Sequence, residues 1–183
     1  MSCSNYIING LKFDECESNL AGVKNVWLSD ADPIEVTTAI TGDYSGLTIT
    51  AISGATKFYH YGMDEQVAYL TSTASMGDNG KLRYYTNELR IAFPRLSAEK
   101  HAEFVALTHN KVMAIVEDNN GVFHFVSLDQ YLRANDGASA ATGQSYDDDN
   151  QYEVILSGRS GYPSIIFDKS VTEGHLEEPI VGA

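Results

Sequence analysis

The sequence predicts a mainly β protein with one packed α-helix, arranged as an antiparallel β-sandwich or barrel. Segments rich in β-branched and aromatic residues recur along the chain and are separated by turn residues, a pattern typical of strands. Residues 114–125 place two apolar strands on either side of Asn120-Gly121, which predicts a hairpin closed by a type I′ turn with two positive-φ residues. One segment, after Pro94, has the pattern of a helix.

Length and composition indicate a single globular domain over residues 1–183. The 183 residues are 43% hydrophobic and 20% charged, and no linker-like stretch divides them. We expect extended segments at both ends, 1–21 and 169–183, with the acidic C-terminal one extended or docked on a neighbouring molecule. The N-terminus lacks the basic and apolar regions of a signal peptide, and no stretch approaches the roughly 20 apolar residues of a membrane span.

Strands are expected along most of the chain. The segments with strand composition are 23–28, 34–38, 47–52, 57–61, 67–72, 82–93, 112–116, 122–125, 152–157 and 164–167, with a weaker candidate at 7–10. Residues 112–116 are apolar without alternation, which predicts a strand that is buried on both faces and central in its sheet.

The longest expected strand, 82–93, has the cleanest alternation. Leu89, Ile91 and Phe93 point to one face and Glu88 and Arg90 to the other, so one face meets a core and the other meets water or a partner. At ~3.3 Å per residue the strand would span about 40 Å. A strand of that length is expected to reach beyond its own domain and suits pairing between subunits.

The expected helix follows this strand. Pro94 ends the strand, Ser97 is a suitable N-cap for a helix that continues to about His109, and Glu99 lies in the first turn, where the helix dipole favours an acid. The apolar face that could cover a sheet consists of Ala98, Ala102 and Val105, with Phe104 and Leu107 on an adjoining stripe.

The region before the last strands is expected to be irregular. Residues 128–133 could form a helical turn, and a loop rich in Gly, Ala and Ser follows over 134–145. Asp147-Asp148-Asp149-Asn150 offers oxygen ligands that suit Ca²⁺, but it lacks the glycine and the closing glutamate of an EF-hand. Because Asp and Asn favour turns, we interpret this cluster as a solvated turn.

No arrangement of residues along the chain predicts catalysis. The five histidines form no HExxH, and the sequence has no GxSxG, P-loop or GxGxxG where a strand meets a helix. Cys3 and Cys16 have no companions at zinc-ligand spacing, and we expect two reduced thiols. We predict no enzyme activity, cofactor or metal, although a nucleophile, a base and an orienting group from distant segments could still meet in space.

Charge and aromatic content indicate which classes of binding partner suit the chain. Twenty-five acidic and twelve basic residues give a net charge of −13, which repels a phosphate backbone and argues against nucleic-acid binding. Eleven tyrosines could form a stacking platform such as carbohydrate-binding modules use, but aromatic residues are also common in sheets and at protein interfaces. A core or interface role is our interpretation, and a carbohydrate-binding module is the alternative from another class.

Several motifs of the chain resemble virion structural proteins from phages of Bacteroidota. The likeness covers about 16–167 and departs from the usual Gly-Gly-Ile-Lys at Ala21 and Val23, and at Gly62, where a charged residue is common. The residues that carry it are Cys16, Ala21-Gly22-Val23-Lys24-Asn25-Val26-Trp27-Leu28, Phe58-Tyr59-His60-Tyr61, the helix, Ile115-Val116-Glu117-Asp118-Asn119-Asn120-Gly121, Thr142-Gly143, 147–152 and Gly158.

The resemblance implies a tail-tube subunit, made in the host cytoplasm and built into the virion as hexameric, homo-oligomeric rings that stack into a tube. The implied partners are further copies of the chain and other tail or connector proteins, with DNA passing nearby and no membrane. Self-assembly into a ring would cover sheet edges, and an acidic lumen would let DNA pass without holding it. A head-to-tail connector or a capsid decoration protein is the alternative within the same class.

The expected assembly residues lie on the long strand, at the turn before it and in the acidic cluster. They are Tyr84, Thr86, Glu88, Arg90, Met76, Asp78, Asn79, Asp147 and Asp149. We hypothesise that the loop 76–81 or the loop 134–149 reaches the next ring and becomes ordered only on assembly.

Overall fold

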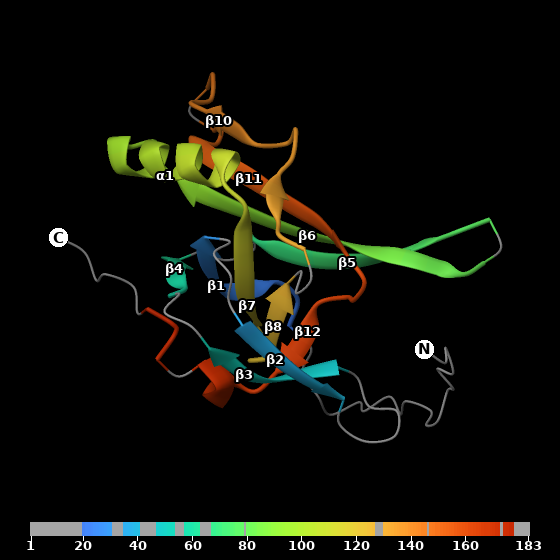
Figure 1. Ribbon diagram of the computed structural model, residues 1–183. Helices are drawn as coiled ribbons and strands as arrows, with labels where there is room; N and C mark the ends of the chain where they lie inside the picture. The colour runs from blue at the N-terminus through green and yellow to red at the C-terminus, as the bar shows by residue number, and fades with distance from the viewer. Residues whose placement is uncertain are drawn as a thin grey trace.

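Two antiparallel sheets pack face to face in the computed structural model, with a third, two-stranded layer behind one of them (Figure 1). The structure describes residues 20–30, 35–40, 47–53, 57–62, 67–78, 80–126, 130–145, 147–172 and 174–177. The predicted mainly β sandwich with one packed helix is confirmed, while the strand candidate at 7–10 lies outside the described residues. The elements are β1 (Val23–Asp30), β2 (Glu35–Ile40), β3 (Leu47–Ser53), β4 (Tyr59–Gly62), β5 (Tyr69–Met76), β6 (Leu82–Pro94), α1 (Ala98–His109), β7 (Val112–Asp118), β8 (Phe123–Val126), β9 (Arg133–Ala134), β10 (Ser139–Ala141), β11 (Gln151–Ser160), β12 (Ile165–Phe167) and the 3₁₀ helix η1 (Lys169–Thr172).

The strand order defines the two main sheets. Sheet 1 has the order β12-β8-β7-β1-β4, and sheet 2 has the order β10-β11-β6-β5 with β9 beside β11. All the strand pairs are antiparallel, and the longest ladder joins β6 to β11, from Pro94 opposite Gln151 to Tyr85 opposite Ser160. Strands β2 and β3 pair only with each other among the described strands and form the third layer.

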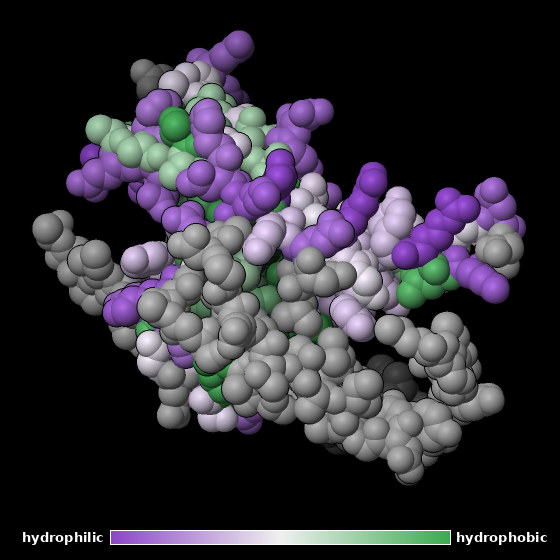
Figure 2. Space-filling view, in the orientation of Figure 1, coloured by the Kyte–Doolittle hydropathy of each residue, from purple (hydrophilic) through white to green (hydrophobic). Residues whose placement is uncertain are grey.

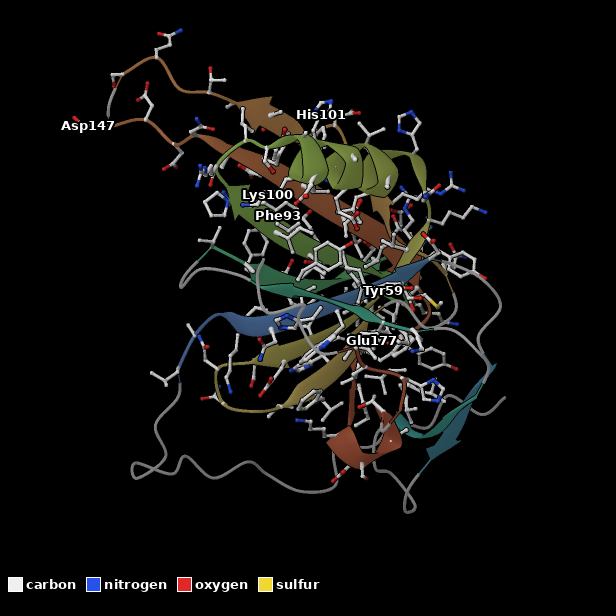
Figure 3. All side chains as sticks on the ribbon, turned by 90° about the vertical axis from the view of Figure 1, so that its left-hand side faces the viewer. Tyr59, Phe93, Lys100, His101, Asp147 and Glu177 are labelled. Atoms are coloured by element: carbon white, nitrogen blue, oxygen red, sulfur yellow. The ribbon has the colours of Figure 1, made fainter. Side chains whose placement is uncertain are left out.

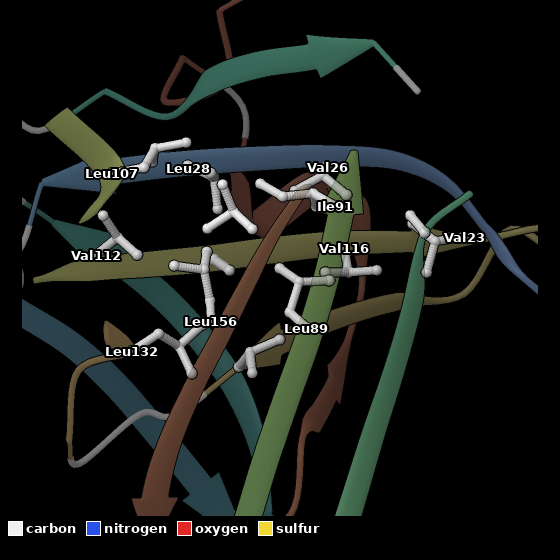
Figure 4. Packing of buried hydrophobic residues seen from close by; sticks show 14 of the residues in the cluster. Val23, Val26, Leu28, Leu89, Ile91, Leu107, Val112, Val116, Leu132 and Leu156 are labelled. Carbon is white, nitrogen blue, oxygen red and sulfur yellow. The ribbon is translucent and has the colours of Figure 1, made fainter. Parts of the chain in front are cut away.

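The main core lies between sheets 1 and 2. Val26 and Val116 of sheet 1 face Leu89, Ile91 and Leu156 of sheet 2, and all five side chains are fully or almost fully buried (Figure 4). The predicted inward face of β6 is thereby confirmed. Burial of such side chains contributes about 1.5–3 kcal/mol each, so this cluster contributes strongly to stability.

A second core covers the opposite face of sheet 1. Ile115 and Phe125 point away from sheet 2 and pack with Ile52 of β3 and with Leu176 near the C-terminus. β7 is therefore buried on both faces and lies in the middle of its sheet, as its unbroken apolar run predicts.

The C-terminal segment packs on its own chain as far as it is described. The backbone N–H of Phe58 donates to the carbonyl of His175 (2.8 Å), and the N–H of Glu177 donates to the carbonyl of Phe58 (2.9 Å). Leu176 completes the second core, and Lys57 pairs with Glu177. Where we expected an extended segment from residue 169, the chain forms η1 over Lys169–Thr172 and then pairs with Phe58. Residues 173 and 178–183 lie outside the described chain, and docking on a neighbouring molecule stays a prediction.

The helix begins as predicted but packs through a narrower stripe. The Ser97 side chain accepts a hydrogen bond from the N–H of Lys100, and α1 ends at His109. Leu107 is buried and Phe104 is half-buried against Tyr152, whereas Ala98, Ala102 and Val105 of the expected face are exposed. α1 covers the end of the space between the sheets, so only one edge of the helix meets the core (Figure 1).

The β7–β8 turn forms where Asn120-Gly121 predicts it, but with a different geometry. Gly121 has φ of +81°, whereas Asn120 is not in the left-handed region, so the turn is not type I′. The carboxylate of Asp118 accepts hydrogen bonds from the N–H groups of Asn120 (2.9 Å) and Val122 (2.8 Å), which favours a type I turn ended by a left-handed glycine.

The expected irregular region contains strands. Leu132 pairs with Val112 and β9 follows directly, so residues 132–134 pair as strand where a helical turn over 128–133 was expected. Residues 128 and 129 lie outside the described chain. Within the expected loop 134–145, β10 pairs with the beginning of β11. Propensity misses both strands because they are short and are fixed by pairing with longer neighbours.

Candidate functional site

The β5–β6 hairpin extends beyond the body of the sandwich (Figure 1). The ladder between β6 and β11 ends at Tyr85, but β5 and β6 remain paired until Met76 lies opposite Leu82. A tight turn closes the hairpin, in which the N–H of Gly80 donates to the carbonyl of Gly77 (2.8 Å). The predicted long strand is confirmed by the thirteen residues of β6, and its pairing with another subunit stays a prediction.

Four of the predicted interface residues share the outer face of sheet 2. Alternation places Tyr84, Thr86, Glu88 and Arg90 on the side opposite the buried Leu89. This face carries polar pairs and an ion pair. It therefore presents a fixed pattern of charge and hydroxyl groups.

The pairs on this face can be located individually. The Tyr69 hydroxyl donates to Glu88 Oε1 (2.8 Å), and this hydrogen bond to a carboxylate raises the pKa of Tyr69. Arg90 Nε donates to Glu153 Oε1 (2.6 Å), and the hydrogen bond lowers the pKa of Glu153. The Arg159 guanidinium lies 5.1 Å from the centre of the Tyr84 ring. These contacts join β5, β6 and β11 across the outer face.

The other predicted interface residues lie at two separate places. Met76 and Asp78 are at the hairpin tip, and Met76 is 61% exposed, while Asn79 lies outside the described residues. Figure 2 shows hydrophobic atoms near this tip among hydrophilic ones. Asp147 and Asp149 belong to the loop between β10 and β11, on the side of the molecule that carries α1 (Figures 1 and 3). The structure therefore does not bring the predicted residues into one patch.

The acidic cluster 147–150 forms a hydrogen-bonded turn. The Asp148 carboxylate accepts from the N–H groups of Gln144 (2.7 Å) and Ser145 (2.8 Å), and these bonds lower the pKa of Asp148. Across the part of the chain that is described, no group of three or more His, Cys, Asp or Glu side chains is arranged to hold a metal ion.

A hollow of about 270 Å³ separates sheets 1 and 2 beside the root of the β5–β6 hairpin, and we call it the sheet hollow. Ser164, His124 and Asp118 line it in that order: the Ser164 Oγ to His124 Nδ1 distance is 3.5 Å, and the His124 Nε2 to Asp118 Oδ2 distance is 3.8 Å. These are the residue types of a hydrolase triad, but the second distance is too long for a hydrogen bond. Sequence motifs could not reveal this convergence, because the three residues come from separate segments without a characteristic spacing.

The same polar residues connect the two sheets. The N–H of Ser164 donates to the Ser72 hydroxyl (3.2 Å), which in turn donates to the fully buried Asn87 of β6 (2.7 Å). The contacts tie β8 and the segment before β12 to β5. They fix the root from which the hairpin extends.

A second hollow, of about 190 Å³, lies beneath α1 at the end of the molecule away from the hairpin tip, and we call it the α1 hollow. Leu28, Tyr61 and Leu107 form its apolar wall, and Asp30 and Glu103 are its acidic residues. The Tyr61 hydroxyl donates to Glu103, and burial together with this bond raises the pKa of Tyr61. Tyr59, labelled below α1 in Figure 3, is 60% exposed at the rim.

No protein-family model matches this sequence, and a search of curated proteins finds no match. The helix α1 has twelve residues, and none of the helices within the described ranges has the length and apolar character needed to cross a membrane.

Proposed function

We propose that this protein is a self-assembling structural subunit of a virion, and that a tail tube is the assembly to which it contributes. The observation that carries the proposal is the edge of sheet 2 formed by β5. A strand at an edge exposes unpaired N–H and C=O groups, and natural sheets usually protect such edges.

β5 differs from the other edge strands of the two main sheets. β4, β10 and β12 have four, three and three residues, whereas β5 has eight. Its sequence, Tyr69 to Met76, contains no charged residue and no proline, and most of its side chains are exposed. Among the described strands only β6 pairs with it. A long, uncharged edge of this kind is suited to pairing with another chain.

A second copy of the same chain is the pairing partner that agrees best with the other features of the molecule. Sheet 2 has β10 at its opposite edge, so head-to-tail pairing of copies would extend the sheet from one subunit to the next and could close a ring. The net charge of −13 disfavours lasting contact with DNA, as a conduit requires. A connector or decoration protein would use the same edge and differ in the shape of its assembly.

The carbohydrate-binding alternative has less support from the positions of the tyrosines. Among the tyrosines that the structure describes, the most exposed are Tyr59, Tyr69, Tyr131 and Tyr162, which belong to β4, β5 and two separate loops. Tyr84 is half-buried beneath Arg159. No single strand face in the described chain presents them together as a stacking platform.

Purified protein examined by analytical ultracentrifugation and negative-stain microscopy tests the proposal. We expect rings or tubes from the unchanged chain and monomers from Thr73→Lys, which places a charge on the exposed edge strand. Ser170→Lys adds the same charge on exposed η1 and is expected to assemble normally. Monomers that are stabilised only by a glycan would support the carbohydrate-binding alternative, and assembly unaffected by Thr73→Lys would exclude the β5 edge as the contact.

A further inference from the structure

The tip of the β5–β6 hairpin carries an exposed apolar pair. Met76 is 61% and Leu82 44% exposed, and the two residues lie opposite each other in the ladder. Both residues lie beyond the end of the ladder between β6 and β11, and neither belongs to a buried hydrophobic cluster of the described residues. Exposed apolar side chains at the end of a projecting element mark a contact point for another surface.

The same tip is locally basic in an acidic chain. Residues 76–83 contain Lys81 and Arg83 against one acid, Asp78, whereas the whole chain has a net charge of −13. Arg83 lies across the turn: a Cβ added at Gly77 would be 2.6 Å from its Nε. Gly77 therefore leaves room for the guanidinium beside the apolar pair.

The α1 hollow has the complementary chemistry at the other end of the molecule. Its wall combines apolar and aromatic side chains with the polar Ser29 and Asn110. Its two carboxylates, Asp30 and Glu103, are the only Asp, Glu, Lys, Arg or His side chains that line it among the described residues. A volume of about 190 Å³ is several times the ~30 Å³ share of one water molecule, so the hollow is large enough to accept an unbranched side chain.

We propose that the hairpin tip of one copy docks into the α1 hollow of a second copy. Met76 enters the hollow, where its flexible thioether can adapt to an irregular wall. Lys81 and Arg83 face Asp30 and Glu103, and these rim charges set the orientation of the contact. The inference rests on the proposed function and adds the contact along the stacking direction.

The geometry favours this receptor over the sheet hollow. The tip and the α1 hollow lie at opposite ends of the molecule, so the contact is head-to-tail and can repeat without limit (Figure 1). The sheet hollow is lined by Tyr69, Leu70 and Ser72 at the root of the same hairpin. It also contains His124 beside its single carboxylate, so it offers less opposite charge to a basic tip.

Disulfide trapping between two variants tests the contact. In a Cys3→Ser, Cys16→Ser background, Met76→Cys chains are mixed with Tyr59→Cys chains and oxidised mildly. We expect a disulfide-linked heterodimer from this mixture and none when Ser170→Cys replaces Tyr59→Cys. Equal trapping at both positions would overturn the proposal. Rings or tubes without any 76–59 disulfide would overturn this inference alone, whereas a chain that never assembles would overturn the proposed function as well.

Charge reversal gives an independent readout that does not need cysteine. Lys81→Glu is expected to weaken association between copies by about tenfold, because it replaces a positive charge with a carboxylate that faces Asp30 and Glu103. Supplying Asp30→Lys in the partner is expected to restore most of that loss, as measured by sedimentation at 50 and 500 mM salt. Failure of the rescue, with both variants folded by circular dichroism, would contradict docking in the α1 hollow.

Discussion

The sandwich body and the projecting hairpin use the same strand, β6, in two different ways. From Leu89 to Phe93 the strand is buried between the sheets, whereas none of its residues from Leu82 to Thr86 is buried. In the body, each inward side chain is explained by the core that it fills. In the hairpin, strand pairing continues where none of the described residues forms a buried cluster, so we expect its side chains to contribute little to the stability of the monomer.

A matched pair of leucine truncations measures this difference most directly. Leu156→Ala removes a fully buried side chain and is expected to lower the free energy of unfolding by roughly 2–5 kcal/mol. Leu82→Ala removes the same atoms from a side chain that is 44% exposed on the hairpin. We expect this variant to change the free energy of unfolding by less than about 0.5 kcal/mol. Urea unfolding of the two variants measures both values.

An assembly assay should rank the two variants in the opposite order, with the larger effect for Leu82→Ala. If Leu82→Ala leaves folding intact but reduces assembly, the hairpin acts between molecules. A loss of folding stability for Leu82→Ala equal to that for Leu156→Ala would show that the hairpin packs against its own body, and the assembly role would lose its support.

The two hairpin turns sharpen the comparison at a smaller scale. Gly121 in the body and Gly80 at the tip both have positive φ, +81° and +72°, and a Cβ at either would meet no atom within 4 Å. Alanine at such a position is strained by roughly 1–2 kcal/mol in each case. We expect Gly121→Ala to lower global stability by about this amount, because its turn joins two core strands.

Gly80→Ala is expected to affect only the tip. The end of the hairpin can open without disturbing the core, so the strain is released locally and global unfolding stays nearly unchanged. Faster hydrogen exchange confined to residues near 74–84 would confirm local opening. Equal global losses for the two alanine variants would mean that the hairpin and the body unfold as one unit.

Local rules predicted the elements that local interactions determine. The Ser97 side chain caps α1 because a hydroxyl before a helical run satisfies a free N–H, and the unbroken apolar run 112–116 gives a strand buried on both faces. Alternation along β6 also placed Tyr84 and Arg90 correctly on a common outer face. Each of these features depends on a short stretch of sequence.

Features that depend on distant partners were missed. The predicted type I′ turn does not form, because the Asp118 carboxylate accepts hydrogen bonds from the turn and favours another geometry. Val105 is exposed because the position of α1 at the end of the sandwich decides which stripe of the helix is buried. The loops 76–81 and 134–149 were each expected to be able to reach the next ring, but sequence gives no distance between them and did not show that they lie at different places on the molecule. The two hollows and the third layer behind sheet 1 depend on strand order, which periodicity does not reveal.

The smallest expected effect concerns the ion pair on the outer face of the body. Arg90 Nε and Glu153 Oε1 are 2.6 Å apart, and both side chains are about a quarter exposed. The hydrogen bond from Arg90 lowers the pKa of Glu153 in the folded chain. Protonation therefore favours the unfolded state, so the stability from this pair is present above the ordinary glutamate pKa of about 4.3 and is lost as pH falls through the lower folded value.

A double-mutant cycle with Arg90→Gln and Glu153→Gln isolates this pair from the additional hydrogen bond between Arg90 and the carbonyl of Val67. We expect a coupling of about 0.2–1 kcal/mol at pH 7 and a smaller one at pH 2, measured by urea unfolding, because a partly exposed pair is screened by solvent. An unchanged coupling at pH 2 would show that the carboxylate charge is not its source. Because assembly through the outer face would remove solvent from the pair, a coupling that increases in the assembled protein would place Arg90 at a subunit contact, whereas an unchanged one would leave the β5 edge and the hairpin tip as the contacts between copies.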